Sequence, residues 1–429
     1  QNFVPKPGTA MARVPAPPFN ELLWTIAMAR HLFGPDMSLQ VPPNLNAGRL
    51  DDLVGAGIND WGGVSPVTPD HVNPESPWPE LAALARETDA AGKVLTPRLT
   101  VYPRYIEQHR EWLHPEIAPA VLRHADASGL ARPDGWCAGA GMSPPVGVAA
   151  PVGAPTGATN FPSRLKALLR ATTEDDIAAL FALRGRDFHQ LAALANDLRR
   201  ETCGDTVTYV VNRNINYTTL CAYKCSFCAF SKGKTDEDLR GAPYVLDMAE
   251  VSRRTEEAWR RGATEVCLQG GIHPAFTGQT YLDVLRAVKE AAPDIHVHAF
   301  SPLEVTQGAK TLGITLEAFL KQLKAAGLGT LPGTAAEILD DEVRKLICPD
   351  KVNTSQWLGV MRTAHKLGLR TTSTIMFGHV ETTRHWARHL LNLRNLQRET
   401  GGFTEFVPLP FVHMEAPMFR RGLARRGPT

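Results

Sequence analysis

Three cysteines lie close together in the sequence TTLCAYKCSFCAF, which spans residues 218–230. Cys221, Cys225 and Cys228 form a C-x3-C-x2-C pattern, so three thiols occur within eight residues. Thiolates are soft ligands that bind zinc, copper(I) and iron–sulfur clusters. Because metal sites built from sulfur usually have four ligands, the pattern indicates a site with one position left for another ligand.

The spacing fits a four-iron cluster better than it fits zinc. A 4Fe-4S cluster needs one ligand per iron, so three cysteines hold three irons and leave the fourth open to a small molecule. A structural zinc site would need a fourth Cys or His, and neither His189 nor Cys203 belongs to a second pair with zinc-type spacing. Buried unreactive cysteines are the remaining alternative, and we expect that role for Cys267 and Cys348.

The composition is that of a globular protein with a sizeable core. The 429 residues are 43% hydrophobic and 21% charged. The net charge is +2 and no block of like charge occurs, so neither nucleic acid nor a membrane is expected as a partner. The N-terminal sequence lacks the features of a signal peptide, and we expect a cytoplasmic protein. Seven cysteines, three of them clustered, favour metal binding over a disulfide framework.

A stretch rich in Gly, Ala and Pro divides the chain. Residues 133–160 are nearly free of charge and contain few large apolar side chains. Such a stretch buries too little apolar surface to offset the entropy of ordering it, so we interpret it as a linker. We therefore predict three parts, at residues 1–130, 131–162 (the linker) and 163–429.

Patterns typical of strands and helices alternate after the linker. The expected strands lie at 207–215, 264–270, 294–300, 328–332, 370–378 and 404–411, and the expected helices between them at 247–262, 281–292, 338–347 and 355–368. An earlier helix at 172–183 opens with Thr173 and Asp176 in a capping-box pattern. Repeated strand–helix units of this length predict an α/β fold with parallel strands, arranged as a partial barrel.

Polar residues and glycines follow several of these strands. In barrels of this kind, ligand contacts concentrate at the carboxyl ends of the strands. The candidates there are Gln269, Gly270, Gly271, His273, Glu304, Thr334, Glu337, Gly378, His379 and Glu381. The alternatives are charges at helix N-termini for the two later glutamates and satisfied core histidines for the two histidines. On the first strand, Asn212, Arg213, Asn214 and Asn216 are polar, and we expect some of them to face a ligand cavity because unpaired burial is costly.

The cysteine pattern, with Phe227 before its last cysteine, resembles the radical S-adenosylmethionine (SAM) superfamily. The resemblance implies a partial TIM-type (β/α) barrel in which the open iron of the cluster binds SAM and a 5′-deoxyadenosyl radical is released on reduction. It assigns SAM contacts to Phe227, Gln269, Gly270, Gly271, Thr334, Glu337 and Gly378. It leaves Asn212, Arg213, Asn214, Asn216, His273, Glu304, His379 and Glu381 as substrate or catalytic candidates.

Further motifs narrow the resemblance. LQGGIHP, HAFSPLEV, PGTAAEIL and MFGHVET together look like the group of deazaflavin (FO) synthases and futalosine-pathway enzymes. HVHAFSPLEV and FVPLPFVHMEAPM are most similar to the tyrosine-dependent FO synthase subunit. This resemblance implies transfer of the 4-hydroxybenzyl group of tyrosine to 5-amino-6-(D-ribitylamino)uracil, with an external electron donor. The alternatives are a futalosine-pathway radical SAM enzyme, an inactive FO synthase fragment and a zinc-stabilised binding protein.

The first part of the chain repeats a motif of the last part. NFVPKPGTAM at 2–11 matches EFVPLPFVHM at 405–414. LQVPPNL and GINDWGGVSPVTPDHVNPE resemble the end of the FO synthase subunit that cyclises the product, which implies the C-terminal units of one barrel fused to a second barrel. The first part has no C-x3-C-x2-C pattern of its own. We expect residues 39–45 and 57–63 to extend the open edge of the second barrel beside residues 207–215.

Overall fold

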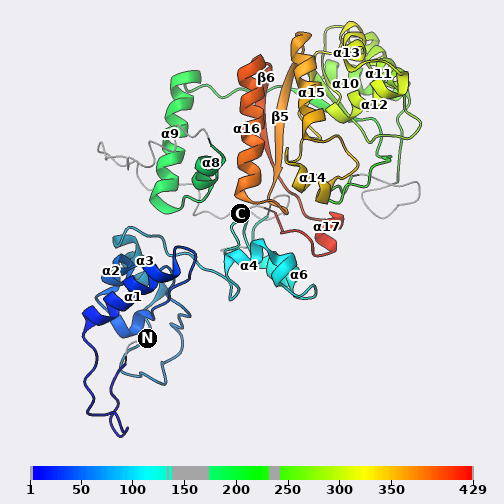
Figure 1. The fold of residues 1–429 in the computed structure, drawn as a ribbon. Coiled ribbons are helices and arrows are strands. Elements are labelled where there is room, and N and C mark those ends of the chain that lie inside the picture. The colour runs from blue at the N-terminus through cyan, green and yellow to red at the C-terminus, as the bar shows by residue number, and fades with distance from the viewer. Residues whose placement is uncertain (1–2, 133–134, 138–172, 231–241, 428–429) are drawn as a thin grey trace. The chain divides into compact units, whose positions relative to one another are not determined.

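The computed structural model describes residues 3–132, 135–137, 173–230 and 242–427 (Figure 1). The chain divides into two compact units, Gln1–Thr96 and Pro97–Thr429. This division falls before the Gly/Ala/Pro-rich stretch and places Pro97 and the residues after it in the second unit. The boundaries at residues 130 and 162 stay a prediction. Most of the predicted linker, residues 138–162, lies outside the described residues.

The first unit is a small helical assembly. Its elements are α1 (Phe19–Phe33), the 3-10 helix η1 (Pro43–Asn46), α2 (Leu50–Ala56) and α3 (Leu81–Ala90). Leu53 and Leu84 are fully buried in its core, and the Trp61 indole donates to Thr88 Oγ1 at 3.2 Å. This small core gives the unit its own packing.

Residues 39–45 and 57–63 both belong to the first unit and pair with each other there. Gln40 and Asp60 form a parallel bridge with each other. Val41 N donates to Asp60 O at 3.4 Å and Asn59 N donates to Leu39 O at 3.3 Å. All six strands of the described sheet come from the second unit, and the extension of that sheet by residues 39–45 and 57–63 stays a prediction.

The second unit is built on one parallel sheet, as the strand–helix alternation predicted. Its six strands pair in chain order, and every pairing is parallel. The strands are β1 (Asn212–Asn216), β2 (Glu265–Gln269), β3 (His296–Ala299), β4 (Thr330–Leu331), β5 (Arg370–Phe377) and β6 (Phe403–Pro410). The order β1 to β6 confirms the open half-barrel.

Helices connect and precede these strands (Figure 1). Those that come before the sheet are α4 (Pro103–Glu107), α5 (His109–Trp112), α6 (Ala118–His124), α8 (Glu174–Phe181) and α9 (Gly185–Cys203). Those that follow β1 are α10 (Met248–Arg260), α11 (Gly278–Ala291), α12 (Pro302–Leu312), α13 (Leu316–Ala325), α14 (Asp341–Ile347), α15 (Thr354–Lys366), α16 (Thr383–Thr400) and α17 (Pro417–Arg420). The described helices include none that is long and apolar enough to cross a membrane.

Two local predictions can be compared with the structure. The capping box at the start of α8 is confirmed, since Asp176 N donates to Thr173 Oγ1 at 3.2 Å and Thr173 N donates back to the Asp176 carboxylate at 3.3 Å. The first strand is shorter than predicted and begins at Asn212. Its partner strand β2 begins at Glu265, opposite Asn212, so the preceding residues have no ladder to join, and Tyr209 is 90% exposed.

The core lies between the sheet and its covering helices. Val266 and Val297 from neighbouring strands are fully buried, and so is Leu285 from α11. A second apolar cluster packs α15 beneath the loop after β4, with Trp357 fully buried. The Trp357 indole donates to Thr334 O at 3.2 Å, so this side chain joins the core to the edge of the sheet where the strands end.

Replacing Trp357 by alanine tests the importance of this packing. Removing a fully buried indole leaves a cavity, and the expected loss in the free energy of unfolding is about 3–5 kcal/mol. The control is Trp259→Ala, because Trp259 is 42% exposed on α10, where the expected change is about 0.5 kcal/mol. Denaturant unfolding measures both, and equal losses in the two variants would contradict this assignment of the core.

Candidate functional site

A cavity of about 340 Å³ opens at the carboxyl ends of the strands. Ten of its lining residues were predicted from the sequence: Asn216, Cys221, Cys225, Cys228, Gln269, Gly270, Gly271, Glu304, Thr334 and Glu337. Nine were not: Tyr223, Phe230, Ile272, Ser301, Leu303, Ala335, Lys351, Thr374 and Leu409. The three cysteines therefore face the same space as the loops that follow β2, β3 and β4.

Three of the four polar candidates on β1 do not line this cavity. Arg213 donates to the Glu257 carboxylate at 2.8 Å and to Arg254 O at 3.1 Å, so its side chain faces α10. Asn212 and Asn214 are exposed. Successive strand residues point to opposite faces, and Asn216 is the one that reaches the cavity because it ends the strand.

Two further candidates lie outside the cavity lining. The His273 ring packs on Phe276 at 4.7 Å between centroids, and its Nδ1 accepts from Ala275 N at 3.1 Å. Phe227 belongs to a cluster of apolar side chains beside the cavity, and its ring centroid lies 5.0 Å from Lys351 Nζ. Both residues support neighbouring loops in this structure.

The loop after β5 forms a closed network of its own. Glu381 is fully buried and accepts from the backbone amides of Gly378 and His379 and from the Trp386 indole. Burial alone would raise the pKa of Glu381, but the neighbouring His379, these donors and Arg425 hold it well below its ordinary value. Gly378, His379 and Glu381 are thus committed to each other and do not line the described cavity.

The cysteine loop is held by backbone bonds to neighbouring segments. Ala222 N donates to Ile272 O at 2.8 Å, and Ile272 N donates to the Cys221 sulfur at 3.3 Å. Ser226 N donates to Ile347 O at 2.9 Å. Burial raises the pKa of the Cys225 thiol to about 12. A buried thiol of this kind becomes a thiolate when a metal replaces its proton.

Gly271 lets β2 approach the cysteine loop closely. A Cβ at this position would lie 2.3 Å from Leu220 O and 2.9 Å from Cys221 Cβ. A Cβ at Gly270 would lie 2.3 Å from the Tyr217 ring. Only glycine fits at such positions without movement of the neighbours. The glycine pair therefore sets the distance between the end of β2 and the cysteines.

The geometry does not favour a mononuclear zinc site. Zinc–sulfur bonds of about 2.3 Å would bring the ligand sulfurs within about 4 Å of each other. Among the described residues, the side chains that bring three ligand atoms within 4.8 Å of one another are Asp340, Glu342 and His385, and the three cysteines are spread more widely. The Arg388 guanidinium, 3.0 Å from the Asp340 carboxylate, opposes a cation at that acidic group.

Glu304 connects the ends of three strands beside the cavity. Its carboxylate accepts from the Tyr217 hydroxyl after β1, from Gly270 N at 3.2 Å after β2, and from Ser301 N at 2.7 Å after β3. The Ser301 hydroxyl donates to the same carboxylate at 2.5 Å. Burial raises the pKa of Glu304. Glu304 was predicted from the sequence as a candidate, whereas Tyr217, which donates to it, was not.

The loop after β4 carries an opposite pair of charges. Lys351 Nζ lies 2.9 Å from the Glu337 carboxylate, and each side chain is 12% exposed. Burial alone would lower the pKa of Lys351, but Glu337 and the nearby thiols outweigh that effect and raise it. Lys351 was not predicted from the sequence because it lies beyond α14, away from any strand end. Its burial in the cavity wall is the property that marks it.

Backbone strain is concentrated in this same loop. Ala335 and Glu337 have φ values of 62° and 47°, which side chains with a Cβ rarely adopt. The buried guanidinium of Arg344 holds the loop by donating to Ala335 O at 3.2 Å and Ile338 O at 3.3 Å. Thr334 Oγ1 is buried and has no hydrogen-bond partner among the described residues. Strained residues of this kind cluster at binding sites, and an unpaired hydroxyl offers a bond to a ligand.

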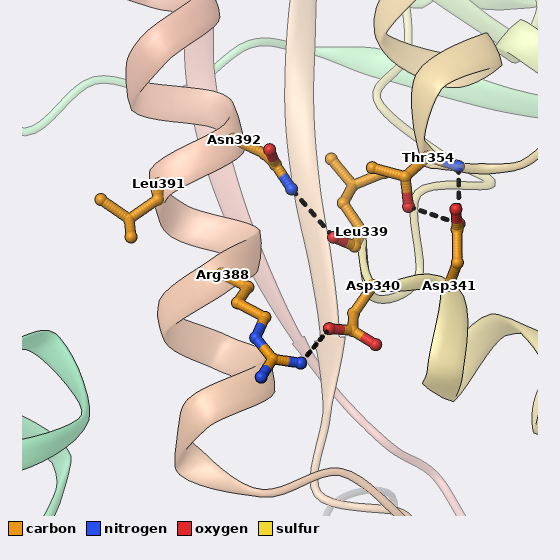
Figure 2. A pocket seen from close by; sticks show the side chains of 7 residues that line it. All are labelled: Leu339, Asp340, Asp341, Thr354, Arg388, Leu391 and Asn392. Carbon is orange, nitrogen blue, oxygen red and sulfur yellow. Dashed lines mark hydrogen bonds and ion pairs between the residues drawn. The ribbon is translucent and has the colours of Figure 1, made fainter. Parts of the chain in front are cut away.

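Figure 2 shows a second hollow, of about 390 Å³, beside α16. Arg388 points from α16 to the Asp340 carboxylate at 3.0 Å, and its Nε donates to Glu174 of α8 at 3.0 Å. Thr354 donates from its amide to Asp341 at 2.9 Å. Arg388 pairs with Asp340, Asp341 accepts from Thr354, and these bonds join neighbouring helices and loops. It contains no cysteine, so we assign it a structural role.

Comparisons with known proteins agree with the superfamily that the cysteine pattern predicted. The profile of the Radical SAM superfamily matches residues 215–393. FO synthase of Streptomyces coelicolor is 44% identical over 478 residues, which cover 100% of this chain and 54% of that protein. The 5-amino-6-(D-ribitylamino)uracil–L-tyrosine 4-hydroxyphenyl transferase of Methanothermobacter thermautotrophicus is 46% identical over 264 residues, covering 62% of this chain and 71% of that protein.

The chain spans about half the length of the FO synthases that it matches. Among solved structures, methylornithine synthase (PylB) has a TM-score of 0.44 and 19% identity, over 60% of this chain and 70% of that chain.

Gly271→Ala tests the close approach at the cysteines. The added Cβ would clash with Leu220 O, and only movement of the backbone can relieve that clash. We therefore expect the amount of iron and sulfide bound after anaerobic reconstitution to fall at least several-fold. Gly359→Ala is the matched control, because a Cβ at that position in α15 has no heavy atom within 4 Å. Metal analysis of both variants checks the expectation, and full iron content in the Gly271 variant would contradict it.

Proposed function

This chain belongs to the radical SAM superfamily, in the family of the FO synthases and the tyrosine 4-hydroxyphenyl transferase, and we propose that its second unit transfers the 4-hydroxybenzyl group of tyrosine to 5-amino-6-(D-ribitylamino)uracil. The observation that carries the proposal is one cavity in which three cysteines face a glycine pair and a Lys–Glu pair. The names of the relatives supply the substrates.

Cys221, Cys225 and Cys228 would hold three irons of a 4Fe-4S cluster. The three sulfurs are spread too widely for one zinc, all three residues line the cavity, and a Cβ cannot be added at the adjoining Gly271. Such a donor set leaves one iron without a protein ligand. When bound, the cluster and SAM would supply two things: transfer of an electron from an external donor, and a carbon-centred radical that abstracts hydrogen from the substrate.

The cavity offers matching partners for SAM. Lys351 and Glu337 present opposite charges, which fit the α-carboxylate and α-amino groups of its methionine part. The Thr334 hydroxyl, buried without a described partner, can bond one further polar atom of SAM. Gly270 and Gly271 allow the backbone after β2 to lie close to the ligand. These residues bind and orient the cofactor.

The rest of the lining suits the two substrates. Leu303, Leu409 and Phe230 present apolar surface for an aromatic ring. Asn216 and Gln269 offer amide groups for the polar ends of tyrosine or for the ribityl hydroxyls. Residues 1–96 carry no C-x3-C-x2-C pattern, so we propose only the transfer step for this chain. Cyclisation to the deazaflavin is proposed for an intact fusion of the two FO synthase subunits. The cytoplasmic location stays a prediction.

The transferase reaction can be tested directly. We expect anaerobically reconstituted protein, given SAM, dithionite, tyrosine and the ribityl diaminouracil, to form 5′-deoxyadenosine and a 4-hydroxybenzyl adduct, both read by mass spectrometry. Deoxyadenosine without the adduct would favour the futalosine-pathway alternative, in which another acceptor is used. A colourless protein that contains one zinc would contradict both the cluster assignment and the proposed reaction.

Lys351→Gln tests the proposed contact with SAM. Removing a buried ammonium that meets the carboxylate of a ligand costs about 1.5–3 kcal/mol, so we expect the Kd for SAM to rise about 10- to 100-fold. Lys321→Gln is the control, because Lys321 pairs with Glu317 on the surface of α13, where its side chain is 61% exposed. Equilibrium dialysis against reconstituted protein measures both, and unchanged affinity in the Lys351 variant would remove this residue from the SAM site.

A further inference from the structure

The cysteine loop rests on a segment close to the end of the chain. Met418 N donates to Ser226 O at 2.7 Å, in the short stretch between Cys225 and Cys228. Met418 is 2% exposed and Cys225 8% exposed, and both belong to one apolar cluster with Phe411. Residues 411–427, which we call the support segment, therefore form one wall behind the cysteines.

The support segment is itself fixed to the sheet. Phe411 N donates to Phe377 O at 2.8 Å at the end of β5. Arg425 is 3% exposed, and its guanidinium donates to Glu381 O at 2.9 Å. Arg425 N donates to His379 O at 3.2 Å. The buried network after β5 thus anchors the support segment, which explains why these polar residues are not in the cavity.

The described residues 97–132 and 135–137, which we call the clamp segment, cover the other side of the support segment. Arg132 Nη1 donates to Gly427 O at 2.7 Å, and Arg426 Nη2 donates to Gly135 O at 3.1 Å. Pro119 lies so close to Gly422 that a Cβ there would meet the Pro119 ring at 2.3 Å. These contacts are spread over the support segment, and each crosses roughly 300 residues of sequence.

Charge and packing add to these bonds. The carboxylates of Glu107 and Asp126 interact electrostatically with the buried Arg425 guanidinium. The Arg123 guanidinium lies over the Phe419 ring, 5.7 Å from its centroid. The clamp segment also has a small core of its own around Ile106 and Leu122, so it is a folded element and not a passive connection.

We propose that the clamp segment holds the support segment against the cysteine loop, and thereby keeps the loop in the conformation that retains the cluster. The effect on cluster retention rests on the proposed 4Fe-4S site. The contact between the clamp segment and the support segment rests only on the hydrogen bonds and packing described above. The clamp segment would then stabilise the cysteine loop of the second unit, although it contains none of the three cluster cysteines.

Two variants of the full chain test the clamp from both sides. Arg132→Gln removes the bond to Gly427, and Arg426→Gln removes the bond to Gly135. We expect each to speed hydrogen–deuterium exchange in the support segment and in residues 218–230 about five- to tenfold in metal-free protein. Arg110→Gln is the control, because Arg110 is exposed on the same clamp segment and, among the described residues, donates no hydrogen bond to the support segment.

Iron release to a chelator from reconstituted protein is the second measurement. We expect the two clamp variants to lose iron about five- to tenfold faster than the wild type and the Arg110 control. Unchanged exchange and unchanged iron release in both variants would overturn the proposal. If no variant, wild type included, binds iron, the proposed function fails, and faster exchange in residues 218–230 would still support the clamp.

Discussion

The buried carboxylate of Glu304 is the interaction on which the described cavity depends. A carboxylate with 1% exposure is costly to bury unless donors surround it. The donors come from Tyr217, Gly270 and Ser301, which follow three successive strands, so the chain satisfies Glu304 only when those strand ends converge. Convergence places Gly271 beside the cysteine loop. One buried charge thus fixes half of the cavity wall.

A buried cation performs the equivalent task on the other half. Arg344 is 3% exposed and donates to backbone carbonyls on both sides of the cavity loop, including Val352 O at 2.5 Å. Its bonds offset the cost of the left-handed backbone at Ala335 and Glu337. Because the loop cannot relax, Glu337 and Lys351 stay at the cavity wall. The site is therefore organised before any ligand arrives, which lowers the entropy that binding must overcome.

The sequence predicted the order of the strands and the cysteines, because both depend on local patterns of period and spacing. It could not predict Lys351, since nothing in the residues around it signals that the folded loop after β4 brings it back to the cysteines. The sequence could not show which face of β1 Arg213 occupies, because alternation along a strand defines two faces and only packing on α10 decides between them. The sequence could not show that Glu381 accepts from the backbone of its own loop, because a polar residue after a strand can bind a ligand or support that loop.

The contact between Ser226 and Met418 joins residues 192 positions apart. A chain grows from its N-terminus at about 5–20 residues per second, so the cysteines leave the ribosome well before their support does. Contacts of such long sequence separation also form late in folding. The thiols of a nascent chain are consequently exposed for a period in which no wall stands behind them. The proposed cluster site is therefore complete only after residues 411–427 have been translated.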